Sequence, residues 1–124
     1  MRGLICACIL AAPAAAAELE LSAADETLIV EVAEAETVFM HGLPSLQFAL
    51  TEGSSAAMAD LTRRMIGRDL TVSLCGRDLV RATVRESISG RGIINMPSAE
   101  AAMAVARVLG DNAACETLAP HFPD

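Results

Sequence analysis

The sequence predicts an α+β domain, a mainly antiparallel sheet with two helices packed on one face. Three observations lead to this class. Several segments alternate apolar and polar residues, as half-buried strands do. Two other segments repeat apolar residues at helical spacing and are bounded by capping residues. These segments follow one another as strands, helix, hairpin and helix, an order typical of helices packed on an antiparallel sheet.

Residues 1–17 are predicted to be a cleaved secretory signal peptide. A basic start at Arg2 is followed by an apolar stretch and by small residues ending at Ala17. A membrane anchor is the alternative, but the uncharged run is shorter than the roughly 17–25 residues that cross a bilayer. Cleavage after Ala17 leaves one domain, residues 18–124, without a membrane span and located in the periplasm or outside the cell.

Two of the four cysteines leave with this signal, so the mature chain keeps Cys75 and Cys115. In an oxidising compartment, such an isolated pair is a candidate disulfide. Closing the loop between them stabilises the fold by about 3–4 kcal/mol in the chain-entropy model. Two buried free thiols are the alternative.

Three strands are predicted in the first half of the mature chain. Leu19 and Leu21 alternate with polar residues, residues 27–34 are rich in β-forming residues, and residues 45–50 alternate cleanly. A helix then begins at Thr51, a typical N-cap residue. Its apolar positions are Met58, Leu61 and Met65, and Gly67 follows it.

A hairpin and a second helix are predicted in the remaining chain. Residues 70–74 and 79–84 have β patterns on either side of a turn at Cys75 and Gly76. Ile93 and Ile94 form a short apolar segment. The second helix begins at Ser98 after Pro97 and ends at Gly110, with an apolar stripe formed by Ala102, Val105, Ala106 and Leu109. Residues 113–118 are predicted to form a last short strand.

Gly90, Arg91 and Gly92 form a candidate binding loop. Consecutive backbone N–H groups beside one cation can hold a small anion. The alternative is an ordinary flexible loop.

The residue types present exclude several function classes. The net charge is −7 and the chain has no Trp or Tyr, which argues against a nucleic-acid partner because such binding rests on neutralising phosphates. His41 and His121 lack metal-ligand spacing, and no nucleophile motif or Cys-x-x-Cys pair occurs. We therefore expect no catalytic residue, no metal and no cofactor.

An ordered set of segments resembles the head subdomain of the first large periplasmic domain of SecD/SecDF, a membrane subunit that assists preprotein export. Residues 44–53 resemble the family's strand ending in Phe-x-Leu-Thr, and the helix up to Gly67 follows as in the family. Residues 67–77 resemble the next strand and turn, with Cys75 where the family has Asp. Residues 84–92 resemble an Arg-Glu-x-Ile segment and a Gly-rich turn, here about two residues shorter, and residues 98–109 resemble the terminal helix.

The resemblance extends over about residues 31–118 and implies a stand-alone head, since the family's proton-coupled transmembrane helices have no counterpart in this sequence. It implies a non-enzymatic periplasmic module that contacts exported or unfolded polypeptide or a membrane protein assembly. It also fits a disulfide that ties the hairpin tip at Cys75 to the predicted strand after the last helix. A secreted adaptor or inhibitor-like protein with one folded partner is the alternative, and the sequence leaves the oligomeric state open.

Overall fold

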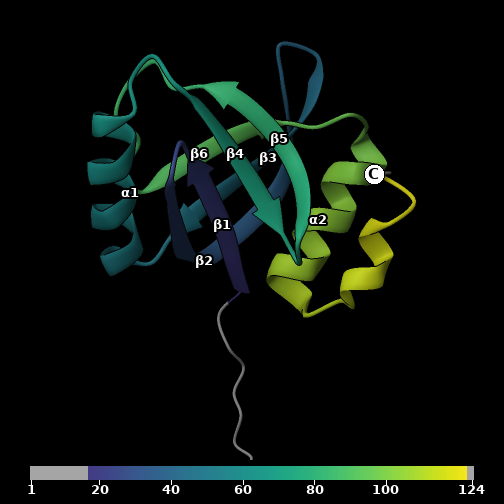
Figure 1. The fold of residues 1–124 in the computed structure, drawn as a ribbon. Helices are drawn as coiled ribbons and strands as arrows, with labels where there is room; N and C mark the ends of the chain where they lie inside the picture. Colours follow the sequence, from purple (N-terminus) through teal and green to yellow (C-terminus); the bar gives the residue numbers. More distant parts are fainter. Residues whose placement is uncertain (1–16, 123–124) are drawn as a thin grey trace, which may run out of the picture.

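The computed structural model describes residues 17–122, so the predicted signal peptide, apart from Ala17, lies outside the described residues (Figure 1). The chain forms an α+β fold, which confirms the predicted class. In chain order, its elements are β1 (Ala17–Ala23), β2 (Glu26–Met40), β3 (Leu43–Leu50), α1 (Glu52–Arg64), β4 (Asp69–Leu74), β5 (Arg77–Thr83), β6 (Arg91–Asn95), α2 (Ala99–Asp111) and the 3-10 helix η2 (Cys115–Leu118).

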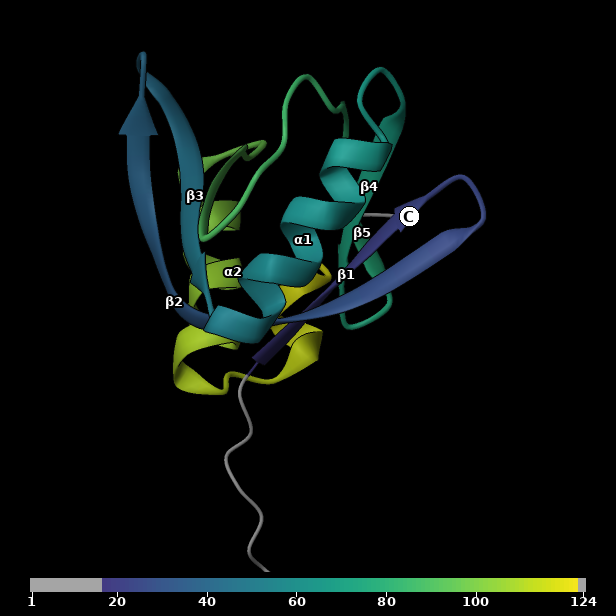
Figure 2. The same cartoon turned by 90° about the vertical axis from the view of Figure 1, so that its left-hand side faces the viewer.

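The described strands form one antiparallel sheet in the order β5-β4-β1-β2-β3-β6. Strand β2 is 15 residues long and pairs with β1 through its first half and with β3 through its second half. A bulge between Val32 and Glu34 separates the two halves, and bulges bend a strand and increase its twist. The sheet is therefore curled, as Figure 2 shows.

Both helices pack on the buried face of this sheet. In β1 and β2, buried residues such as Leu19 and Val30 alternate with exposed ones such as Glu18 and Glu31. Because α1 contacts β2 and β3, and α2 contacts β1, β2 and β3, both must lie over the buried side. They share one hydrophobic core with the strands, so the predicted placement on one face is confirmed.

The two helix starts use different contacts. Ser98 caps α2 as predicted, because its Oγ accepts a hydrogen bond from the N–H of Ala101 at 3.0 Å. Thr51 occupies the N-cap position of α1, but its side chain makes no capping bond. Instead, Ser54 Oγ accepts the N–H of Glu31 at 2.8 Å, which attaches the first turn of α1 to β2.

Two predicted boundaries and one predicted element were wrong. Strand β2 continues to Met40 because the bulge after Val32 interrupts its alternation and hides the second half. Helix α2 ends at Asp111, and Asn112 rather than Gly110 adopts the left-handed conformation after it (φ 58°), which Asn tolerates. Residues 113–118 contain η2 instead of a strand, since a helical turn brings Leu118 into the core.

A disulfide joins Cys75 to Cys115, with Cα atoms 6.0 Å apart. Cys75 and Gly76 both have positive φ (56° and 79°) in the turn between β4 and β5, as a two-residue type I′ hairpin turn requires. The bond therefore ties the hairpin tip to η2, the segment after the last helix. A hydrogen bond of 2.8 Å from Arg77 to the carbonyl oxygen of Phe122 links the same two regions.

Candidate binding groove

A cavity of about 520 Å³ lies between the two outer strands of the curled sheet. One wall consists of β5 and the segment that follows it, and the other consists of β6. The floor is apolar and comes from three elements. Phe48 of β3, Met58 of α1 and the β4 residues Leu70 and Val72 form this floor. We call this cavity, lined by residues 80–86, Ile88 and residues 92–95, the β5–β6 groove.

The β6 wall presents backbone groups that no strand of the described chain pairs with. Met96 N–H donates to Pro44 O at 3.0 Å and Leu50 N–H donates to Gly90 O at 2.8 Å. Since bonding alternates along an antiparallel pair, the N–H and C=O groups of Ile93 and Asn95 point away from β3. Strand β6 has no second neighbour in the sheet, so this edge is open to an added strand.

Strand β5 is open in the same way. Val84 N–H donates to Arg68 O at 2.9 Å, so the same alternation turns the backbone groups of Arg81 and Thr83 away from β4. Two open edges thus border one cavity, from opposite ends of the sheet. Open edges are sites where another extended chain can pair.

The candidate loop at residues 90–92 is corrected by the structure. Arg91 and Gly92 belong to β6, and only Gly90 (φ +81°) lies in the preceding connection. A Cβ atom at Gly92 would collide with the ring of Phe48. The glycine therefore serves close packing of an aromatic ring against a strand rather than loop flexibility, and the ring it accommodates is part of the groove floor.

The segment between β5 and β6 is held against α1 by Thr62, a residue that the sequence analysis did not select. Thr62 is fully buried. Its Oγ1 accepts the N–H of Ile88 at 2.8 Å and donates to the carbonyl oxygen of Met58 at 2.8 Å. Ser87 Oγ also donates to the carbonyl oxygen of Ala59, at 3.1 Å. In the sequence, the indication of this role is that Thr62 is a polar residue beside the apolar stripe of α1.

The Thr62→Val substitution is expected to lower the free energy of unfolding by about 1–3 kcal/mol, because it leaves the N–H of Ile88 without its acceptor. Thr62→Ser keeps the hydroxyl and is the matched control, with an expected loss of below about 1 kcal/mol. Urea unfolding of both variants measures the difference. A loss for Thr62→Ser as large as predicted for Val, with little or no loss for Thr62→Val, would show that the methyl group, and not the hydrogen bond, matters.

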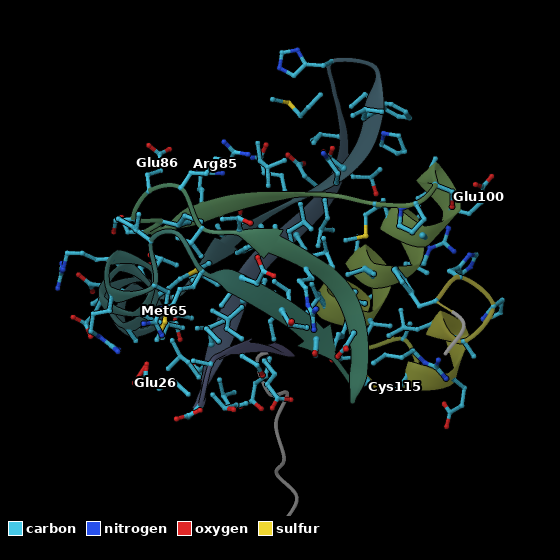
Figure 3. The ribbon with its side chains drawn as sticks, turned by 45° about the horizontal axis from the view of Figure 1, so that its top comes forward. Glu26, Met65, Arg85, Glu86, Glu100 and Cys115 are labelled. Carbon is cyan, nitrogen blue, oxygen red and sulfur yellow. A yellow bond between two sulfur atoms is a disulfide. The ribbon has the colours of Figure 1, made fainter. Side chains whose placement is uncertain are left out.

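Three arginines and one glutamate lie on the segments that border the groove. Arg81 and Arg85 line the cavity together with Glu86, and Arg91 lines a smaller hollow that shares Glu86 and Gly92 with it. Figure 3 shows Arg85 and Glu86 pointing outward from the segment after β5. Away from this region, Arg64 donates hydrogen bonds to Glu26 and Asp60. These bonds raise the pKa of Arg64, and the bond to Glu26 has the larger effect. The contact with Glu26 also ties α1 to the start of β2.

The other sequence candidates do not form a site. His41 lies in the turn between β2 and β3 and His121 follows η2. No group of three or more metal-ligating side chains occurs within residues 17–122. Over the same residues, no helix is long and apolar enough to cross a membrane.

The β2–β3 hairpin extends beyond the body of the domain (Figures 1 and 2). Its tip exposes three apolar side chains, with Phe39 the most exposed at 62%. The other two are Met40 and Leu43. This tip was not among the sites predicted from the sequence.

Two solved structures are similar to this chain. One is described as SecDF, a membrane component that enhances protein export, and the other is a crystal structure of SecDF in a super-membrane-facing form. Each is 31% identical to this chain, with a TM-score of 0.58 and a match over 63% of it. The match spans 37% of the first chain and 11% of the second. No family model and no curated protein matches the chain.

The chain therefore contains a SecDF-like domain, which confirms the resemblance found in the sequence. The domain corresponds to a minor part of the solved chains, and the similarity supports a module related to protein export. Its disulfide fits an oxidising, extracytoplasmic location.

Proposed function

We propose that this chain is a non-enzymatic periplasmic module that binds exported or unfolded polypeptide in the β5–β6 groove. The observation that carries the proposal is the pair of open strand edges that border one apolar cavity. An extended polypeptide segment can supply backbone hydrogen-bond partners to the two edges and apolar side chains to the floor.

The binding step is the addition of a strand. The outward N–H and C=O groups of Ile93 and Asn95 bond to the backbone of the incoming segment, and every second side chain of that segment points to the floor. Backbone bonds do not depend on side-chain identity. The groove therefore suits clients of many sequences, as a module of protein export requires.

The similarity to SecDF supports this assignment, because that protein is described as one that enhances protein export. We further propose that the domain corresponds to the head of the first periplasmic domain of that family. In this proposal, residues 1–17 direct export and are removed, and the domain contacts either the exported polypeptide or a membrane assembly that delivers it.

Peptide binding tests the proposal directly. A fluorescent ten-residue peptide of alternating Val and Thr is expected to bind, whereas the same peptide with alternate backbone nitrogens methylated is expected to bind at least about tenfold more weakly, since it cannot pair with an edge. Anisotropy measures both affinities. Equal affinities would exclude strand addition, and no binding by any unfolded client would overturn the proposed function.

The hairpin tip favours a second candidate function, an adaptor for one folded partner. Phe39, Met40 and Leu43 form an exposed apolar group at the end of a projecting hairpin, and such groups mark interaction sites. In this case one protein would be retained in a periplasmic pull-down, the Phe39→Ser variant would lose it, and aggregation of unrelated unfolded clients would not be suppressed.

A further inference from the structure

Four residues line the β5–β6 groove with their backbone rather than with their side chains. The strand register places their side chains on the face of the sheet opposite the floor residues Leu70 and Phe48. All four nevertheless line the cavity, because their N–H and C=O groups point away from the paired strands β4 and β3. They are Arg81 and Thr83 of β5 and Ile93 and Asn95 of β6. The open edges of both strands therefore face the same cavity.

The side chains of these edge residues leave the space between the two strands open. Thr83 Oγ1 donates a hydrogen bond of 3.0 Å to Asp69 of β4. In the same way, Asn95 Oδ1 accepts a hydroxyl of β3 at 3.0 Å. Each bond directs the side chain back over the paired strand. On the floor side, β5 presents Ala82 and β6 presents Gly92, which are both small. Neither edge is covered by its own side chains at these positions.

We propose that one extended segment of the client lies between β5 and β6 and pairs with both strands at once. This inference rests on the proposed function and adds the class of segment that the groove accepts. In an extended chain, the backbone groups of successive residues point to opposite sides, so one alternate set bonds to β6 and the other to β5. Because all neighbouring strands of the sheet are antiparallel, β5 and β6 run in opposite directions. The segment is therefore antiparallel to one edge and parallel to the other.

This arrangement excludes proline from the bound segment. Proline has no backbone N–H, and a strand paired on one side only tolerates it where the N–H would face solvent. A segment paired on both sides has no such position. The groove therefore selects apolar segments that are free of proline over the length of β6, which is five residues.

Two N-methylated forms of the ten-residue Val-Thr peptide test this arrangement, one methylated at every Val and the other at every Thr. Each form lacks one alternate set of N–H groups. Both are expected to bind at least about tenfold more weakly than the unmodified peptide, because each set bonds to one edge. If either form keeps the affinity of the unmodified peptide, the two-edge arrangement is overturned and polypeptide binding stands. If no peptide and no unfolded client binds, both proposals fail.

The Thr83→Pro variant tests the β5 edge on the protein itself. It removes an N–H that points to the cavity and no backbone hydrogen bond to β4. Thr83→Ala is the matched control, since it keeps this N–H and loses the same side-chain bond to Asp69. The Pro variant is expected to bind the unmodified peptide about fivefold more weakly than the Ala variant, the effect of one hydrogen bond. Equal affinities of the two folded variants would overturn pairing with β5, and the methylated peptides decide the question if Thr83→Pro does not fold.

Discussion

Replacing Ala82 with Trp is expected to weaken polypeptide binding at least about tenfold, a loss of about 1.4 kcal/mol of binding free energy. Ala82 lies on β5 opposite Leu70, lines the groove and is exposed. A large ring at this position would occupy the space over the apolar floor. Because the site is open to solvent, the substitution should change the stability of the fold by less than about 0.5 kcal/mol.

Ala33→Trp provides the matched control. Ala33 is an exposed strand alanine at the bulge of β2, outside the groove lining. The chain contains no tryptophan, so each variant also carries a single fluorescent reporter. Adding client should change the emission of neither variant strongly, since the new ring blocks the groove in Ala82→Trp and lies away from it in Ala33→Trp. Normal binding by Ala82→Trp would place the client elsewhere on the domain.

Breaking the disulfide is expected to produce the largest loss of stability. The Cys75→Ser/Cys115→Ser variant should lose about 3–4 kcal/mol of unfolding free energy, because the unfolded chain is no longer constrained by a closed loop. The urea midpoint should fall by about 2 M. The same bond anchors the β4–β5 hairpin to η2, so the β5 wall of the groove should become less ordered at its turn.

Reduction supplies the control for this variant. The unmodified protein in dithiothreitol should match the double variant, and the double variant should not respond to dithiothreitol. The double variant and the reduced protein are each compared with the oxidised protein. If both urea midpoints lie within about 0.5 M of the oxidised value, η2 stays attached without the bond, through contacts such as that of Arg77 with Phe122.

Local chemistry allowed much of the fold to be predicted. The alternation of Leu19 and Leu21, the cap at Ser98 and the turn at Cys75 and Gly76 each depend on residues close together in the chain. These are the features that sequence patterns express directly. The bulge in β2 was missed because an extra residue shifts the alternation, and a pattern of period two cannot describe the strand on both sides of it.

The groove depends on distant parts of the chain and could not be predicted in this way. Its two walls, β5 and β6, stand at opposite ends of the sheet order, and only the curl of the sheet brings them to one cavity. Gly92 was interpreted as a loop residue because glycine is common in loops, whereas the structure shows that it makes room for Phe48. The role of Thr62 likewise depends on Ile88, which lies 26 residues away.

Amide-resolved NMR during titration with the Val-Thr peptide tests the central claim most directly. The largest shifts, and new protection from hydrogen exchange, are expected at the outward N–H groups of Ile93 and Asn95, with further shifts at residues 80–86 and in the floor. Shifts confined to α2 or to the tip of the β2–β3 hairpin, with unchanged exchange at Ile93 and Asn95, would contradict it.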